Sequence, residues 1–194
     1  MSGANVLVVF YSRTGVTETL ALAAGVGAVH AGASIRLRRI RDSADDKKIA
    51  AHKAWVENRE RMNKEYSEPT AADVDWASAI ILAAPHGFDA FSAEVSGFLR
   101  TIRSFSTDGK LANKIAGAFD STSLGAENAP GLASVFSALA GTGLTVVPSG
   151  ASGADDSEDT GAEKPLPARS PEIALAQNYG RLLARKADAL TASK

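Results

Sequence analysis

The chain of 194 residues contains no cysteine. This absence excludes disulfide bonds and catalysis by a thiol group. Histidine is also scarce: the chain has three, at His30, His52 and His86, and their scattered positions argue against a zinc cluster. We therefore predict no metal site, and we expect any redox chemistry to come from an organic cofactor.

Neither sign of charge is in excess, because 21 lysines and arginines stand against 22 aspartates and glutamates. A chain so close to neutral has no net field that would favour nucleic acid or an anionic membrane as a partner. No apolar run approaches the roughly 20 residues that span a bilayer, and no charged-then-apolar leader begins the chain. We expect a cytoplasmic protein without membrane insertion. Because 45% of its residues are hydrophobic, residues 1–194 should fold as a single domain.

The N-terminal segment combines an apolar run with a loop rich in hydroxyl groups. Val6–Tyr11 lacks the alternation of a half-exposed strand and is typical of a strand buried on both faces of a parallel sheet. Good helix formers follow the next loop, Ser12–Thr17, so this loop lies at a helix N-terminus. Free N–H groups, the helix dipole and the hydroxyls of Ser12, Thr14 and Thr17 could hold a phosphate without metal or lysine. A simple helix-capping loop is the alternative, and the loop alone does not decide between the two.

The next segment predicts a helix over residues 17–29 and an edge strand over residues 34–40. Gly25 and Gly27 lower the helix propensity but permit close packing on the sheet. Four arginines are expected to form the solvated face of the edge strand, with a basic patch for a second phosphate as the weaker alternative: Arg36, Arg38, Arg39 and Arg41. Residues 42–69 predict an exposed amphipathic helix. Its stripe of larger side chains, expected to pack against the rest of the domain, contains Trp55, Met62 and Tyr66.

Two further apolar runs end in loops of small or polar residues. Residues 79–84 and 114–119 predict strands that lead into these loops. Parallel strands place their carboxyl ends at one edge of a sheet, so we expect both loops to meet the N-terminal loop in a shared crevice. In that crevice, Phe88 is favoured as the neighbour of an aromatic ring, and His86 is a candidate ligand contact.

The remaining segments complete an alternation of strands and helices. Helices are predicted over residues 93–103, 132–140 and 171–190, and a fifth strand over residues 144–147. With the first strand at the centre, this alternation predicts an α/β fold. The predicted architecture is a flavodoxin-like three-layer sandwich around a five-stranded parallel sheet in the order 2-1-3-4-5.

The loop Ser12–Glu18 resembles the FMN phosphate loop of flavodoxins. A longer pattern resembles the WrbA family of FMN-dependent NAD(P)H:quinone oxidoreductases. The segments that carry this resemblance are Val6–Ser12, Ala79–Pro85 with Phe88, Phe98–Leu99, Gly109–Ala116, Phe119 with Ser121 and Thr122, and Gly143–Gly150. The resemblance covers most of the chain, apart from the segment after Arg41 and the acidic loop before the last helix.

The resemblance implies an FMN site in three parts. The phosphate would be held by Ser12, Arg13, Thr14, Gly15, Val16 and Thr17. The flavin ring would lie against Pro85, His86, Gly87, Phe88 and Asp89 on one side. On another side it would meet Ser121, Thr122, Ser123, Leu124 and Gly125. Such an enzyme takes hydride from NAD(P)H onto the flavin and passes two electrons to a quinone, with no side chain acting as a general base. The resemblance also implies a homo-oligomer, either a tetramer or a dimer.

The chain departs from the family pattern at the ring side of this site. It has His86–Ala90 where the family usually has Thr-Arg-Phe-Gly-Asn, and the family's histidine pair falls on Gly141 and Thr142. Two alternatives therefore stay open beside the oxidoreductase. One is a flavodoxin-like electron carrier without its own substrate, and the other is a flavin-free flavodoxin-like binding protein.

Overall fold

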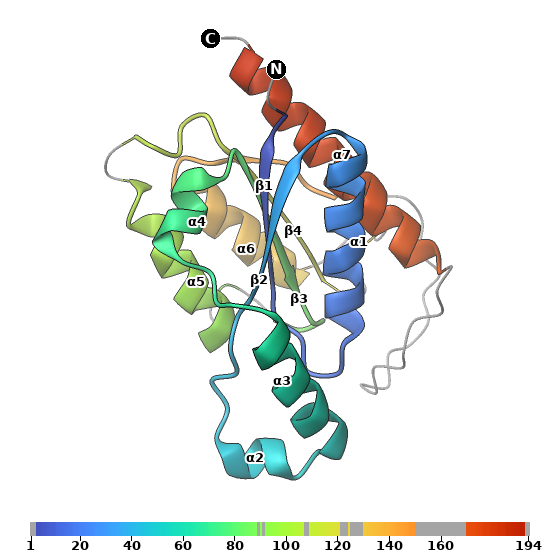
Figure 1. The fold of residues 1–194 in the computed structure, drawn as a ribbon. Coiled ribbons are helices and arrows are strands. Elements are labelled where there is room, and N and C mark those ends of the chain that lie inside the picture. The colour runs from blue at the N-terminus through green and yellow to red at the C-terminus, as the bar shows by residue number, and fades with distance from the viewer. Residues whose placement is uncertain are drawn as a thin grey trace.

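The fold is built on a sheet of five parallel strands in the order β2-β1-β3-β4-β5, which confirms the predicted topology (Figure 1). The computed structural model describes residues 3–88, 90, 92–106, 109–120, 124, 130–149 and 170–192. The strands are β1 (Asn5–Phe10), β2 (Ser34–Arg39), β3 (Ala79–Ala84), β4 (Ile115–Asp120) and β5 (Thr145–Val146). All five match the predicted ranges to within one residue at each end, and β5 is shorter than predicted by one residue at each end.

Helices cover both faces of the sheet. On one face lie α1 (Val16–His30) and α7 (Pro171–Ala192), and on the other lie α4 (Ala71–Trp76), α5 (Ala93–Arg103) and α6 (Pro130–Ala140). Two further helices, α2 (Asp46–Ala50) and α3 (Lys53–Glu65), lie beyond the carboxyl ends of the strands (Figure 1). No helix among the described residues is long and apolar enough to cross a bilayer.

Strand β1 divides the core into two layers because its side chains alternate between the faces of the sheet. Val6, Val8 and Phe10 pack in the layer that contains α1 and α7. Leu7 and Val9 pack in the layer on the opposite face. All five side chains are fully buried, and burial of each is worth about 1.5–3 kcal/mol. The central position predicted for this apolar strand is therefore explained by burial on both sides.

The register of the sheet brings three loops to one edge. Phe10 at the end of β1 pairs with Ala83 of β3, and Ala84 pairs with Asp120 at the end of β4. The backbone N–H of Tyr11 then donates to the Ala83 carbonyl at 3.0 Å. The segments that follow β1, β3 and β4 therefore begin at the same level, as the sequence predicts.

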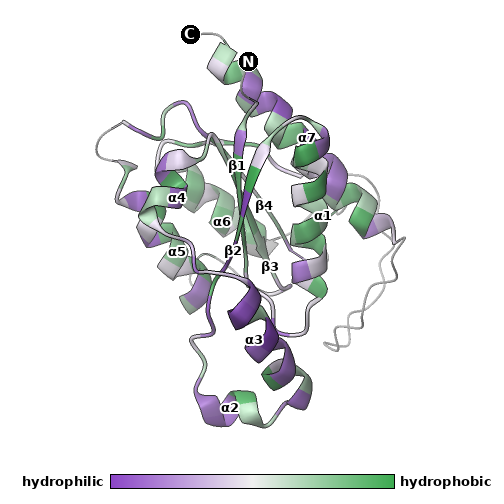
Figure 2. Ribbon diagram, in the orientation of Figure 1, coloured by the Kyte–Doolittle hydropathy of each residue, from purple (hydrophilic) through white to green (hydrophobic). Residues whose placement is uncertain are grey.

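The segment 42–69 forms two helices rather than the single helix that its periodicity predicts. The Asp45 carboxylate accepts a hydrogen bond from the Lys47 N–H at 2.9 Å and begins α2 there, and the extended backbone of His52 separates α2 from α3. Figure 2 shows that α3 is mostly hydrophilic. Its Trp55 and Met62 are nevertheless buried, so the prediction that this stripe packs against its own domain is confirmed for these two residues.

Glycines set the distance between α1 and α7. A Cβ atom at Gly27 would lie 1.8 Å from the Gln177 carbonyl oxygen, and one at Gly180 would lie 1.9 Å from the Ala24 carbonyl oxygen. Both distances are far below van der Waals contact, so only glycine permits this crossing. The prediction that Gly27 serves packing on the sheet is therefore wrong, because it faces α7. Gly25 does face the sheet, since its Cβ would meet the Ile35 side chain at 3.2 Å.

Gly180→Ala is expected to destabilise the protein, because the added methyl group would collide with the backbone of Ala24. Backbone atoms, unlike a flexible side chain, cannot rotate out of the way, so the two helices must move apart. We expect a loss of about 1–3 kcal/mol in the free energy of unfolding, measured by urea denaturation. Gly97→Ala in α5 is the matched control, since its Cβ would meet nothing closer than Arg100 at 3.8 Å. The control should gain up to about 1 kcal/mol from helix propensity. Equal stability of the two variants would contradict this account.

Candidate cofactor crevice

The loop between β1 and α1 has the geometry of an anion site. Gly15 precedes the first residue of α1 with φ of 98°, a left-handed conformation that favours glycine. The Gly15 N–H donates to the Ser12 hydroxyl at 3.0 Å, which closes the loop. Among the described residues, no side chain caps the N-terminus of α1 with a hydrogen bond. The N–H groups of its first turn and the positive end of its dipole are therefore available to an anion.

A buried hydroxyl in the first turn of α1 fits a phosphate group. Thr17 is fully buried, and its Oγ1 has no hydrogen-bond partner among the described residues. A buried polar atom left in that state costs about 1–3 kcal/mol. A phosphate at the end of α1 would accept a hydrogen bond from this hydroxyl and from the adjacent N–H groups. The donors present thus suit a phosphate group.

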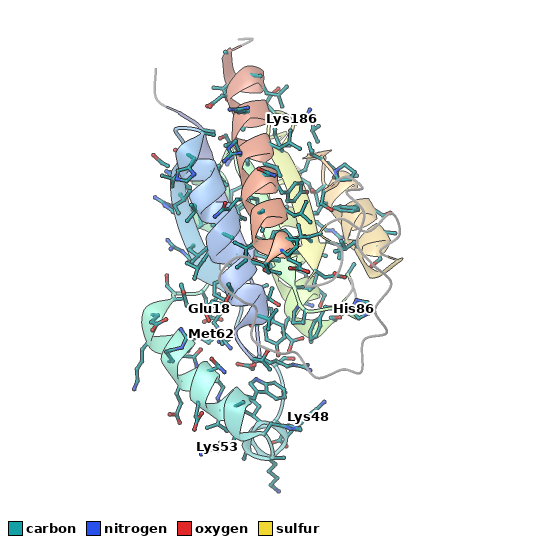
Figure 3. The ribbon with its side chains drawn as sticks, turned by 90° about the vertical axis from the view of Figure 1, so that its right-hand side faces the viewer. Glu18, Lys48, Lys53, Met62, His86 and Lys186 are labelled. Atoms are coloured by element: carbon teal, nitrogen blue, oxygen red, sulfur yellow. The ribbon has the colours of Figure 1, made fainter. Side chains whose placement is uncertain are left out.

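A carboxylate in the same turn is neutralised by α3. Glu18 is buried, and its Oε1 accepts hydrogen bonds from the Arg61 guanidinium at 2.9 Å and from the Tyr66 hydroxyl at 2.8 Å. The hydrogen bond to Glu18 raises the pKa of Arg61, and burial raises the pKa of Tyr66, so one donor stays charged and the other stays protonated. Figure 3 shows Glu18 at the end of α1 that adjoins α3, which carries Met62. The charge of Glu18 is therefore matched before any anion approaches the loop.

The Arg13 guanidinium lies among three aromatic rings. Its carbon is 4.5 Å from the ring centre of Trp55, 5.0 Å from that of Phe88 and 5.7 Å from that of Tyr11. Its Nε–H donates to the Tyr11 hydroxyl at 3.0 Å. Each ring attracts the cation through its negative face, so the position of Arg13 is set by the fold rather than by solvent.

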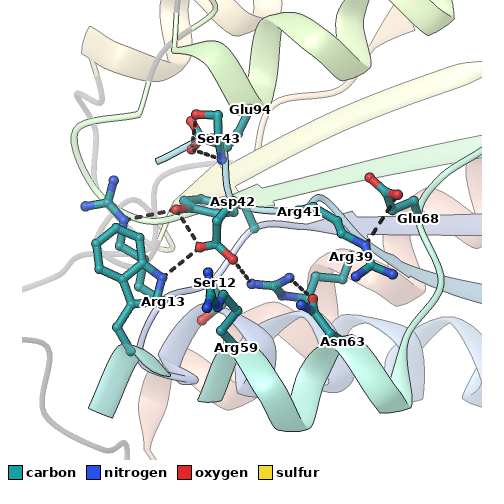
Figure 4. Close-up of polar contacts among 12 residues, drawn as sticks. Ser12, Arg13, Arg39, Arg41, Asp42, Ser43, Arg59, Asn63, Glu68 and Glu94 are labelled. Carbon is teal, nitrogen blue, oxygen red and sulfur yellow. Dashed lines mark hydrogen bonds and ion pairs between the residues drawn. The ribbon is translucent and has the colours of Figure 1, made fainter. Parts of the chain in front are cut away.

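The Asp42 carboxylate joins this cluster to α3 and β2 (Figure 4). Its Oδ1 accepts from the Trp55 indole at 2.7 Å and from the Tyr11 hydroxyl at 3.2 Å. Its Oδ2 accepts from the Arg39 guanidinium at 2.7 Å. Burial raises the pKa of Tyr11, so its phenol keeps its proton and can donate to Asp42 while it accepts from Arg13.

The loop after β3 forms the facing wall. Pro85 is buried, Gly87 has φ of 79°, and Phe88 packs on Tyr11 with ring centres 5.0 Å apart. His86 is 56% exposed, and its Nδ1 lies 3.6 Å from Oδ2 of the buried Asp120. Figure 3 places His86 at the same end of the sheet as Glu18. Phe88 thus lies next to the loop after β1, so the loops after β1 and β3 meet as the sequence predicts.

The remaining predicted site residues are placed differently or lie outside the description. Thr14 is exposed on the loop, and Val16 is buried at the start of α1. Leu124 is 3% exposed and packs in the core layer of α1 and α7. The other predicted contacts lie outside the described residues: Asp89, Ser121, Thr122, Ser123 and Gly125.

The arginines of the edge strand are paired with acids rather than simply solvated. Arg39 is 1% exposed, so its expected place on the solvated face is wrong. It is buried because the segment 42–69 covers the end of β2 and supplies Asn63, whose oxygen accepts from Arg39 at 2.6 Å. Arg36 and Arg38 both pair with the buried Asp73, at 3.1 and 2.8 Å. These cations are neutralised within the fold.

Sequence reasoning missed the cluster around Asp42. Tyr11 counts only as the end of an apolar run, Asp42 as the start of a polar segment and Trp55 as part of a packing stripe. Asp42, 31 positions after Tyr11, meets the Tyr11 hydroxyl and the Trp55 indole only because the segment after β2 folds back over the first loop. An indole and a phenol among dense charges are the one signal that could have suggested a buried polar contact.

Comparison of the chain with known proteins agrees with this geometry. An NAD(P)H dehydrogenase (quinone) of Deinococcus radiodurans is 37% identical over 114 residues, which are 59% of this chain and 56% of that protein. Another, of Cupriavidus metallidurans, is 30% identical over 146 residues, which are 73% of this chain and 69% of that protein. The crystal structure of a WrbA-like flavodoxin from Agrobacterium tumefaciens superposes with a TM-score of 0.54 at 18% identity, covering 95% of this chain and 97% of that one. No protein-family model matches.

The chain belongs to the flavodoxin-like, WrbA-type family. The matched segment spans little more than half of the Deinococcus relative, 56% of its length. Within the described residues of this family member, no group of three or more histidine, aspartate or glutamate side chains could hold a metal ion. The predicted family and its flavodoxin-like fold are confirmed.

Asp73 is expected to make stability depend on pH at the acid end. Burial alone would raise the pKa of this carboxyl, but hydrogen bonds from Arg38 and Thr70 outweigh it and lower the pKa to about 2 from an ordinary value of 3.8. The ionised form therefore stabilises the fold by roughly 2 kcal/mol above about pH 4. This stabilisation is lost as the pH falls through the folded-state pKa.

Asp73→Asn should consequently lower the free energy of unfolding by roughly 2 kcal/mol at pH 7, and this deficit relative to the wild type should shrink between about pH 4 and about pH 2. Urea denaturation at several pH values measures both quantities. Asp75→Asn, an exposed change on the same helix, is the control and should show no such dependence. A deficit that stays constant down to pH 2 would argue against the ion pairs as its cause.

Proposed function

We propose that the chain is an FMN flavoprotein that acts as an NAD(P)H:quinone oxidoreductase and transfers two electrons from NAD(P)H to a quinone. The observation that carries this proposal is the buried, unpartnered Thr17 hydroxyl beside the uncapped N-terminus of α1. The relatives named NAD(P)H dehydrogenase (quinone) support the choice of reaction.

The phosphate end of the site follows from the donors at the start of α1. The first-turn N–H groups and the Thr17 hydroxyl would bind the FMN phosphate, while Ser12 keeps the loop closed through its bond to Gly15. This arrangement needs neither metal nor lysine. It also suits a chain of nearly zero net charge, because the attraction is local to the helix end.

The ring end of the site follows from the loop after β3. Pro85 and Phe88 would present apolar surface to the flavin, and Phe88 is already fixed against Tyr11 at 5.0 Å. Bound FMN would supply the hydride acceptance and electron release, which no side chain of the chain can provide. The protein's own contribution would be to position the ring, limit water around it and keep Tyr11 protonated in its wall. No general base is required.

The test begins with titration of the cofactor-free protein with FMN, followed by anaerobic addition of NADPH and then of a benzoquinone. Flavin absorbance that is bleached by NADPH and restored by the quinone is the expected result. Bound flavin that NADPH cannot reduce would favour an electron carrier without its own substrate. Failure to bind FMN at high micromolar concentration would leave the flavin-free binding protein.

Thr17→Val is expected to weaken FMN binding about tenfold or more, because it removes one hydrogen bond to a charged phosphate while it keeps the shape of the side chain. Quenching of FMN fluorescence on binding measures the dissociation constant. Thr19→Val is the matched control, since the Thr19 hydroxyl already donates to the Gly15 carbonyl at 3.1 Å. If both variants bind FMN as the wild type does, the Thr17 hydroxyl does not contact the phosphate.

A further inference from the structure

Phosphate binding by the loop after β1 does not explain the position of the Arg13 side chain among three aromatic rings. The Thr17 hydroxyl and the first-turn N–H groups of α1 are donors for the FMN phosphate, whereas the Arg13 guanidinium contacts the rings of Tyr11, Trp55 and Phe88. We propose that Arg13 binds the phosphate groups of the pyridine dinucleotide reductant. This inference rests on the proposed function, because it assigns a binding residue to the NAD(P)H of that reaction.

The first support is the state of the charge on Arg13. Among the described residues, no carboxylate lies within ion-pairing distance of its guanidinium. The nearby Asp42 has both oxygens engaged, with Arg39 on one and with Trp55 and Tyr11 on the other. The charge of Arg13 is thus held by aromatic faces, which attract a cation without cancelling its charge.

The second support is the geometry of the guanidinium. Its Nε–H is taken by the Tyr11 hydroxyl at 3.0 Å, and the rings of Trp55 and Phe88 lie 4.5 and 5.0 Å from its carbon. What remains is the edge with the two terminal nitrogens, which Figure 4 shows pointing away from the Asp42 cluster. Two parallel N–H groups on a rigid plane match a phosphate in a bidentate manner.

The third support is position. Phe88 belongs to the loop against which the flavin ring would lie, and Arg13 is its immediate neighbour. Hydride transfer requires the nicotinamide to stack on the flavin, so the diphosphate of the dinucleotide must fall just beyond the ring. Arg13 is a cation fixed at that border. The FMN phosphate, by contrast, has its own donors at the start of α1.

The contact from Trp55 separates this site from the phosphate loop itself. Trp55 comes from α3, in the segment 42–69 that the family resemblance does not cover. Its indole N–H is held by Asp42 at 2.7 Å, which turns its face to Arg13. A buried tryptophan therefore orients the Arg13 guanidinium. A loop that bound only the FMN phosphate would not require this contact.

The experiment measures binding directly, by titrating NADP⁺ and NAD⁺ calorimetrically into the FMN-loaded protein, where neither ligand is turned over. Arg13→Met removes the charge but keeps an unbranched apolar side chain that can fill the space between the rings. We expect the dissociation constant of the dinucleotide to rise roughly 10-fold to 100-fold. The KM for NADPH should rise with it at unchanged kcat, because the contact is equal in the ground and transition states.

Two comparisons complete the test. Arg13→Lys should recover part of the affinity, because it keeps the charge and loses the fork. Arg36→Met is the matched control, since Arg36 also lies over a tryptophan, Trp76 at 4.2 Å, but belongs to the edge strand. Equal losses for NADP⁺ and NAD⁺ assign the contact to the diphosphate, and a loss for NADP⁺ alone assigns it to the 2′-phosphate. Either result supports the proposal.

The overturning results are distinct from failure of the proposed function. If Arg13→Met weakens FMN binding and leaves the dinucleotide unaffected, the guanidinium serves the FMN phosphate instead. If it changes neither, the cation has no role in anion binding. Wild-type protein that takes up no FMN, or that holds FMN which NADPH cannot reduce, would remove the proposed function and this inference together.

Discussion

The candidate cofactor site depends on one buried carboxylate, that of Asp42, whose side chain is 3% exposed. An isolated charge in such a position would cost several kcal/mol, so it is stable only when its oxygens are fully bonded. Arg39, Trp55 and Tyr11 satisfy it, and they come from β2, α3 and the end of β1. One polar centre thus ties three separate parts of the chain together at the carboxyl edge of the sheet.

This arrangement is also compatible with the proposed anion site in a chain that is nearly neutral. Acidic groups stand close to the phosphate loop, but each is matched inside the fold: Asp42 by Arg39 and Glu18 by Arg61. Among the described residues near this loop, the helix end of α1 has no side-chain cap and Arg13 has no ion-pair partner. Positive potential therefore arises locally from pairing and from backbone dipoles, and the net charge of the chain is no guide to it.

Much of the fold could be predicted from the sequence because it rests on local patterns. The apolar runs of β1 and β3 indicate strands buried on both faces, and parallel pairing then places their following loops at one edge. Arg39 could not be predicted, because whether an edge-strand side chain meets solvent depends on where a distant segment folds. The same holds for Trp55, since helical spacing indicates burial but not the partner that covers it.

The phosphate loop shows a different limit. Ser, Thr and Gly at a strand-to-helix turn suit a cap and a phosphate site equally, so composition cannot separate the two. Thr17 favours the phosphate site, because a capping hydroxyl would be expected to have a partner and this one has none among the described residues. An anion is therefore favoured by a missing hydrogen bond, which the sequence does not show.

The two ends of the crevice also differ in where they come from. The proposed phosphate end uses the start of α1, next to the central strand β1. The wall around Arg13 uses Trp55 and Asp42, from the segment that interrupts the family pattern. Added segments on a fixed scaffold commonly carry specificity, because they can change without disturbing the sheet. By that logic, changes in α2, α3 and the loop that joins them to β2 would alter the surroundings of Arg13 more than they would alter the sheet.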